Sequence, residues 1–130
     1  MPPLESIDVI ENLDEFKLLL TQNPGLIIIK FSATWCGPCK KIADAFESGL
    51  RQMPENVQPV ILDIDECFEM YAFMKNKKMV TGIPSILCYY KNSTDFVRFV
   101  PNDSCMGSDI AQLNLFFERC FLFAKSLAGV

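Results

Sequence analysis

The chain has 130 residues, of which 50% are apolar and 12% aromatic, and its formal net charge is −4. This composition indicates a folded domain with a buried core, not a disordered chain. No cluster of basic residues occurs, so we expect no nucleic-acid partner. No apolar run approaches the length of a membrane span, and residues 1–6 lack the features of a signal peptide. With too few cysteines for a stapled secreted domain, we expect a cytoplasmic protein with reduced thiols.

Apolar spacing divides the chain into alternating strands and helices with breaks at turn residues. Asn12, followed by Glu15, resembles a capping box and predicts the start of the first helix. The run 26–31 is apolar throughout, which is typical of a strand covered by helices on both faces. The turn 91–94 predicts a hairpin, and 101–107 is predicted to be a polar loop. In chain order the expected elements are an edge strand 7–10, a helix near 13–20, a central strand 26–31, a helix 40–51, a strand 57–65, a helix 68–75, a strand 86–90, its hairpin partner 95–100 and a closing helix 110–127.

The segment 33–40, Ala-Thr-Trp-Cys-Gly-Pro-Cys-Lys, joins the central strand to the following helix. The first turn of a helix has unpaired N–H groups and the positive end of the helix dipole, which favour a thiolate. Cys39 lies one turn from Cys36 and can close a disulfide with it, while Gly37 and Pro38 fix the small ring between them. The pattern predicts a redox-active dithiol.

The other cysteines test the alternative of a zinc site, which C-x-x-C pairs also build. Zinc would need two further cysteines or histidines at matched spacing. The chain has no histidine, and Cys67, Cys88, Cys105 and Cys120 form no second close pair, so we expect no metal. Cys88 and Cys120 lie on apolar segments and are predicted to be buried small hydrophobes, Cys67 to be free, and Cys105 to be exposed in the polar loop.

Segment 33–40 resembles the thioredoxin active site residue for residue, and Gly82-Ile83-Pro84 resembles the second signature of that family. The order of the expected elements extends the resemblance over nearly the whole chain. It implies an α/β thioredoxin fold, with a central mixed β-sheet flanked by helices on both faces, in a single domain over 1–130. It also implies a cis peptide bond between Ile83 and Pro84, facing the two cysteines.

The resemblance implies a thiol–disulfide oxidoreductase that reduces protein disulfides. Cys36 is then the exposed attacking thiol and Cys39 the buried resolving thiol. No metal or organic cofactor is required, and the implied electron donor is an NADPH-dependent thioredoxin reductase. The residues expected to contact disulfide-containing protein substrates are Trp35, Gly37, Pro38, Ile83 and Pro84.

Lys30 is the main departure from the family, because thioredoxins commonly have a buried aspartate there, beneath the cysteines. A charged amine would favour a nearby thiolate, whereas an amine made neutral by burial could act as a base. Alternatively, Lys30 extends to the strand end and carries no chemistry. We include Lys30 among the candidate catalytic residues, with Asp63 as its possible partner. Asp44 replaces a helix-kinking proline of the family, which predicts an uninterrupted helix.

These departures keep a second function open, in which the chain is a thioredoxin-like binding module or complex subunit and the dithiol is secondary to docking. On the closing helix, Leu115 and Leu122 are predicted to lie opposite the buried face. They are either isolated exposed leucines or the contact of a weak homodimer or another partner.

Overall fold

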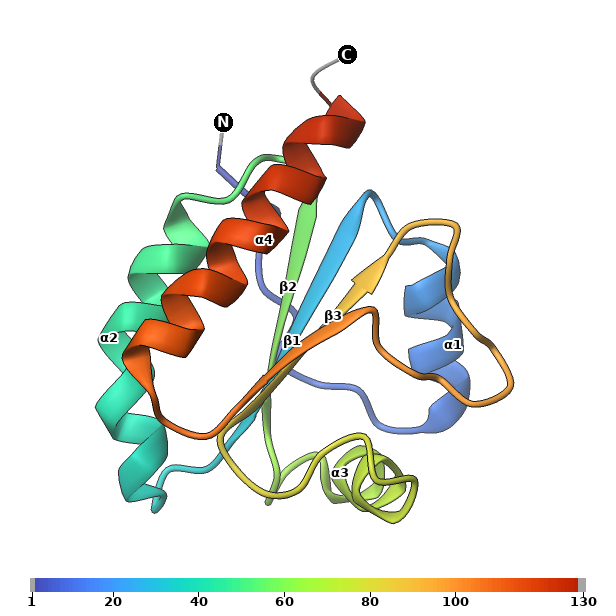
Figure 1. Ribbon diagram of the computed structural model, residues 1–130. Coiled ribbons are helices and arrows are strands. Elements are labelled where there is room, and N and C mark those ends of the chain that lie inside the picture. Colours follow the sequence, from blue (N-terminus) through green and yellow to red (C-terminus); the bar gives the residue numbers. More distant parts are fainter. Residues whose placement is uncertain (1, 129–130) are drawn as a thin grey trace.

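The computed structural model describes residues 2–128 and contains a four-stranded mixed sheet with two helices on each face (Figure 1). Its helices are α1 (Leu13–Thr21), α2 (Gly37–Arg51), α3 (Phe68–Asn76) and α4 (Ile110–Ala128), and its strands are β1 (Leu26–Ser32), β2 (Val57–Asp63), β3 (Ser85–Tyr90) and β4 (Asp103–Met106). The expected α/β architecture is confirmed. Within the described residues, no helix combines the length and apolarity that crossing a bilayer demands.

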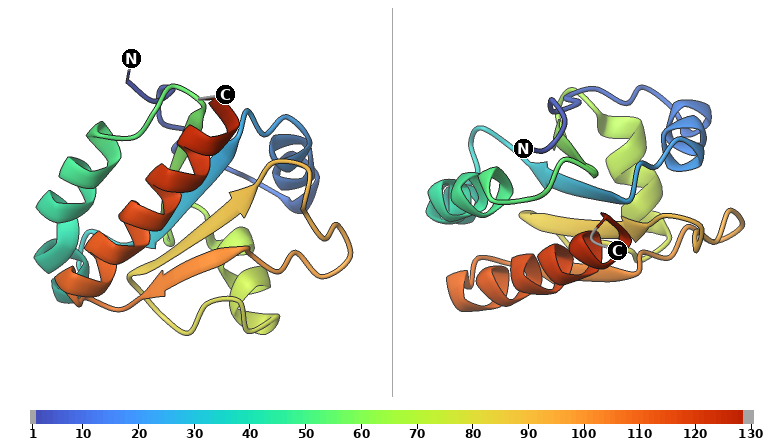
Figure 2. Two further views of the ribbon diagram at one scale, coloured as in Figure 1. Left: turned by 45° about the horizontal axis from the view of Figure 1, so that its top comes forward. Right: turned by 90° about the horizontal axis from the view of Figure 1, so that it is seen from above.

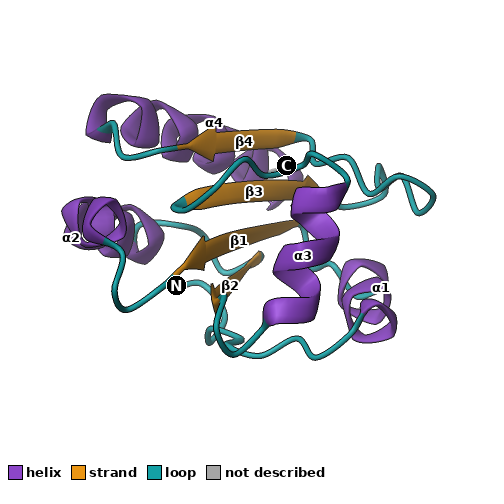
Figure 3. Cartoon of the chain, turned by 90° about the horizontal axis from the view of Figure 1, so that it is seen from below, coloured by secondary structure: helices purple, strands orange, loops and turns teal. Residues whose placement is uncertain are grey.

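The sheet has the order β2-β1-β3-β4, which Figure 3 shows from the end where β1 leads into α2. β1 is parallel to β2 and antiparallel to β3, and β3 is antiparallel to β4. Ile29 faces Val60 on one side and Leu87 on the other, so β1 has strand partners along both edges. Its side chains are buried from Leu26 to Phe31, as the continuous apolar run predicts.

Helices cover both faces of the sheet (Figure 2), and side-chain alternation along β1 divides the interior into two cores. Ile27, Ile29 and Phe31 face α1 and α3, whereas Leu26 and Ile28 face α2 and α4. The first core includes Phe16, Met70, Met74 and Phe99, and the second includes Ile42, Phe46, Phe116 and Phe117. Both faces are therefore covered, and the strand ends remain available for function.

The N-terminal segment confirms one expectation and corrects another. Asn12 Oδ1 accepts the backbone N–H of Glu15 at 2.9 Å, as a capping residue does. The predicted edge strand 7–10 is wrong, because the segment makes only an isolated parallel bridge between Ile7 and Val60. Strand β2 also ends at Asp63, earlier than predicted, because Asp63 Oδ1 accepts the N–H of Asp65 in a turn.

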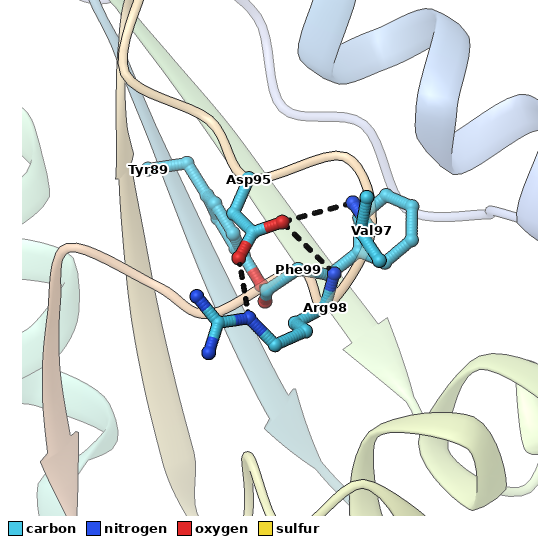
Figure 4. A network of polar contacts seen from close by, with 5 residues as sticks. All are labelled: Tyr89, Asp95, Val97, Arg98 and Phe99. Atoms are coloured by element: carbon cyan, nitrogen blue, oxygen red, sulfur yellow. Dashed lines mark hydrogen bonds and ion pairs between the residues drawn. The ribbon is translucent and has the colours of Figure 1, made fainter.

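The predicted hairpin partner 95–100 is wrong, and that segment is a helical turn closed by Asp95 (Figure 4). Asp95 Oδ1 accepts the N–H groups of Val97 and Arg98, and Asp95 Oδ2 lies 2.8 Å from Arg98 Nε. Phe99 is buried, has a positive φ of 59° and presents its carbonyl to the Tyr89 hydroxyl. The strand that pairs with β3 is instead Asp103–Met106, inside the expected polar loop 101–107.

The closing helix α4 buries one face and leaves several apolar side chains exposed. Leu113, Phe116, Phe117, Cys120 and Ala124 are buried against the sheet and α2. Three other apolar residues of α4, Ile110, Phe121 and Leu127, are exposed, because α4 packs on the sheet edge and α2 and leaves the rest of its surface open. Leu115 and Leu122 are exposed as expected.

Candidate active site

Cys36 lies at the junction of the β1–α2 loop and helix α2. Its backbone is extended, with φ −83° and ψ 111°, and its sulfur accepts the N–H of Cys39 at 3.1 Å, so Cys36 is the N-cap of α2. The helix therefore begins at Gly37 and not at Lys40 as predicted. Pro38 fits this first turn because its missing N–H would have no intrahelical partner there. Beyond it, α2 continues without interruption through Asp44 to Arg51.

Cys36 and Cys39 are joined by a disulfide, with their Cα atoms 5.2 Å apart. Each residue is only 4% exposed, and the pair packs with Ala33 against Ile64 and Ile83. The expectation that Cys36 is exposed is therefore wrong for the oxidised form, because these apolar neighbours cover both cysteines. The two are distinguished by position: Cys36 caps the helix, whereas Cys39 lies inside its first turn.

The loop before β3 lies against the disulfide. Its Ile83–Pro84 peptide bond is cis, as the resemblance implies, and the Ile83 carbonyl oxygen lies 4.0 Å from Cys36 Sγ. Ser85 Oγ donates to the Gly82 carbonyl, and the N–H of Gly107 donates to the Pro84 carbonyl at 3.0 Å. Gly107 has a φ of +85°, a conformation that favours glycine, and sequence reasoning missed its part in holding this loop.

The surface around the disulfide is open and aromatic. Trp35 is 65% exposed, and its Nε1 donates to Asp65 Oδ2 at 2.8 Å. A Cβ built on Gly37 or on Gly82 would meet nothing within 4 Å, so backbone is accessible on both sides of the pair. Pro38 is exposed beside Gly37. The structure thus gathers the predicted contact residues at one end of the sheet, and it adds Asp65, which fixes the indole and which no sequence signal singled out.

Lys30 is buried on the α2 face of the sheet, at 8% exposure. Its Nζ lies 4.7 Å from the Phe46 ring centroid. Burial lowers the pKa of the Lys30 amine, and the negative charge of Glu47 partly opposes that shift. The acidic neighbour is therefore Glu47, not Asp63. Phe46 lies two turns beyond Cys39 on α2, so the amine packs under the helix that begins at the disulfide.

Metal ligation has no support in the described part of the chain. No group of three or more histidine, cysteine, aspartate or glutamate residues within 2–128 is arranged to hold a metal ion. The four cysteines outside the disulfide, Cys67, Cys88, Cys105 and Cys120, are free and buried. Cys105 was expected to be exposed, and it is buried because its segment forms strand β4 under α4.

Comparison with known proteins agrees with this geometry. The thioredoxin family model matches residues 8–104. Thioredoxin 1 of Plasmodium falciparum is 30% identical over 77% of this chain and 90% of its own length. Thioredoxin domain-containing protein 8 of Rattus norvegicus is 32% identical over 82% of this chain and 93% of its own. The solved structure of oxidised mitochondrial thioredoxin 3 from Saccharomyces cerevisiae superposes with a TM-score of 0.65 at 27% identity, covering 87% of this chain and 94% of that one.

These similarities extend from the active-site loop across most of the sheet and its helices. The matched region contains both cysteines, Trp35 and the cis-proline loop. The family acts on disulfide-containing proteins, and the joined cysteine pair is the group that such chemistry requires. The chain therefore belongs to the thioredoxin family and is a thiol–disulfide oxidoreductase of the thioredoxin type with a C-x-x-C dithiol.

Proposed function

We propose that Cys36 is the attacking thiol and Cys39 the resolving thiol in the reduction of protein disulfides. In the reduced enzyme, the Cys36 thiolate attacks one substrate sulfur and expels the other as a thiolate, which forms a mixed disulfide. The Cys39 thiolate then attacks Cys36 Sγ and releases the second substrate sulfur. Two electrons pass to the substrate, and the enzyme is left as the Cys36–Cys39 disulfide.

The observation that carries this assignment is the N-cap position of Cys36. Its sulfur accepts the N–H of Cys39 and sits at the positive end of the α2 dipole, and both features stabilise a thiolate. Cys39 lies inside the first turn of the helix and not at its N-cap, yet its sulfur is within bonding reach of Cys36. This asymmetry supports attack by Cys36 and resolution by Cys39.

Trp35, Gly37, Pro38, Ile83 and Pro84 are proposed to form the contact surface for the substrate chain. The cis-proline loop supports this, because the Ile83 backbone lies beside Cys36 and an extended peptide could pair with it as an added strand. The open backbone at Gly37 and Gly82 leaves room for such a chain.

Lys30 is proposed to tune the resolution step through its charge, as a positioning residue and not as a direct acid or base. Its amine packs on the Phe46 ring under α2, and an aromatic face favours the charged ammonium, which supports an electrostatic role. Lys30→Asp should change turnover and its pH profile more than it changes KM. Unchanged turnover and pH profile in both Lys30→Asp and Lys30→Met would remove this role.

We further propose that 1–130 is one thioredoxin domain of the cytoplasm, reduced by an NADPH-dependent thioredoxin reductase. The family match supports the electron donor, because a dithiol that reduces substrates must be reduced again after each cycle. Consumption of NADPH by a purified thioredoxin reductase, dependent on this chain, tests the donor. Absence of consumption with a reductase that is active on its own thioredoxin would contradict it.

Trapping of mixed disulfides tests the roles of the two cysteines. Cys39→Ser should accumulate a covalent complex with a disulfide-containing protein, because nothing resolves it, whereas Cys36→Ser should trap none. Cys67→Ser is the matched control, since Cys67 is free and buried on the other face of the sheet. Equal trapping by both active-site variants would overturn the assignment.

The oligomeric state is proposed to be a monomer or a weak homodimer, with Leu115 and Leu122 as the contact. Both leucines are exposed on α4, at 48% and 62%. Sedimentation of the parent chain and of Leu115→Lys/Leu122→Lys should show concentration-dependent association in the parent alone if the dimer exists. A parent that stays monomeric at all concentrations excludes the dimer.

A further inference from the structure

Three free cysteines gather between the sheet and α4, in the core opposite α1 and α3. Cys88 on β3 is fully buried, Cys120 on α4 is 1% exposed and Cys105 on β4 is 8% exposed. Cys105 pairs with Ile86, which lies two residues before Cys88 on β3, and residues two apart on a strand share a face, so Cys88 and Cys105 point to the same core. The Cys120 thiol donates to Cys88 Sγ at 3.8 Å, so the two sulfurs are in direct contact.

From this contact we propose that Cys88 and Cys120 are a second dithiol–disulfide site, which locks α4 to the sheet when it is oxidised. A disulfide needs its sulfurs about 2 Å apart, so the side chains must close by a little under about 2 Å. Both thiols are already oriented toward each other, and they come from elements 32 positions apart in sequence. A cross-link here constrains the unfolded chain over that whole loop.

The chemistry balances with a low-molecular-weight disulfide, such as glutathione disulfide, as the oxidant. One cysteine attacks glutathione disulfide, which forms a mixed disulfide and releases one glutathione thiol. The second cysteine attacks the mixed disulfide and releases the other glutathione thiol. The two cysteines thereby lose two protons and two electrons, glutathione disulfide gains them, and a Cys88–Cys120 disulfide bond remains.

In this proposal, the ion pair between Arg119 and Asp103 controls access to Cys88 and Cys120. Arg119 Nε and Nη2 donate to the two carboxylate oxygens of Asp103 at 2.8 and 3.1 Å, which ties α4 to β4. Arg119 precedes Cys120 in sequence, and Asp103 is the cross-strand partner of Cys88. Burial also raises the pKa of the Cys88 thiol, which keeps it protonated in the closed state. Oxidation therefore waits for local opening of α4, unlike exchange at Cys36–Cys39.

The test uses the Cys36→Ser/Cys39→Ser variant, so that no active-site disulfide contributes. The protein is equilibrated in glutathione buffers from reducing to oxidising, quenched with acid, denatured, alkylated and mapped by mass spectrometry. The expected product has lost two alkylatable thiols and contains one peptide pair linked through Cys88 and Cys120. Four alkylated thiols in every buffer, or a linkage through Cys105 in place of Cys88 or Cys120, would overturn the proposal.

Three added variants test the role of the Arg119–Asp103 ion pair and the pairing of the cysteines. Arg119→Gln should reach the same product roughly two- to fivefold faster, because an ion pair at a partly exposed rim contributes little more than that to opening; an unchanged rate refutes that role. Cys67→Ser should behave as the parent, and Cys88→Ala should form no cross-link. The oxidised Cys36→Ser/Cys39→Ser variant also tests the lock without any substitution at the Cys88–Cys120 pair: its Tm should rise by about 5–15 °C over its own reduced form, and a Tm that does not rise refutes the lock.

Discussion

Lys30→Met removes a buried charge without leaving a cavity, and it should stabilise the protein at pH 7. Lys30 is 8% exposed, so its ammonium gives up most of its hydration on folding. A cation–π contact with the Phe46 ring, 4.7 Å away, offsets about 1–2 kcal/mol of this lost hydration. Replacing buried ion pairs by apolar groups of similar volume is often neutral or stabilising by about 1–4 kcal/mol. For the single Lys30 charge, which the ring contact partly offsets, we expect a gain at the low end, about 1–2 kcal/mol.

The pH dependence identifies the cause of that gain. Burial lowers the pKa of the folded Lys30 amine below its unfolded value of 10.5. Between these two values the unfolded chain binds more protons than the folded chain, so the unfolding free energy contributed by Lys30 rises with pH. The gain in unfolding free energy from Lys30→Met should therefore be largest below the pKa of the folded Lys30 amine. It should shrink as the pH rises through that pKa toward 10.5.

Urea unfolding of parent and variant from pH 7 to pH 10.5, both with Cys36–Cys39 oxidised, measures this difference. Ionisation of the free cysteines is common to both proteins and cancels in the subtraction. A variant that is less stable than the parent at pH 7, or a difference that stays constant with pH, would refute the reasoning. Either result would mean that the Lys30 amine is solvated or paired well enough to carry its charge without cost.

Two further substitutions test the indole and the helix contact. Asp65→Ala removes the hydrogen-bond acceptor of Trp35 Nε1, so kcat/KM for a protein disulfide should fall about two- to tenfold. The unfolding free energy should change by less than about 0.5 kcal/mol. An unchanged kcat/KM argues against the indole as a contact for the substrate. Gly49→Ala places a Cβ against three atoms of the Phe117 ring, closer than van der Waals contact allows. Overpacking of about 1–3 kcal/mol should exceed the helix-propensity gain of about 1 kcal/mol, and a variant more stable than the parent in urea unfolding contradicts this.

Local patterns were sufficient to predict the redox centre. The Cys36 and Cys39 pair follows an apolar strand and starts a helix, so its place in the fold can be predicted from the neighbouring residues alone. The cis bond at Pro84 came from the family resemblance, and no property of the local sequence distinguishes it from a trans bond. Segment 26–31 was predicted correctly because a strand buried on both faces is apolar throughout.

The errors arose where distant contacts override local pattern. Segment 95–100 alternates enough to suggest a strand, but Phe99 packs on Phe16 and Phe73, and Asp95 closes a helical turn. Because the strand was predicted at 95–100, segment 101–107 was predicted to be a loop, and Cys105 was therefore predicted to be exposed. Lys30 was paired with Asp63 along the sheet, whereas its long side chain reaches Phe46 across to α2. The Phe99 and Lys30 contacts have no sequence signature, since each joins residues set side by side only by the fold.

Reduction of insulin disulfides by the purified chain, with dithiothreitol as the electron source, tests the central claim most directly. The parent should accelerate precipitation of the insulin B chain well above the rate with dithiothreitol alone, and Cys36→Ser should return the rate to that background. Cys67→Ser, which removes a free buried thiol outside the site, should match the parent. A parent rate equal to background, or a Cys36→Ser rate equal to the parent, would contradict the account of Cys36 and Cys39 as the working dithiol.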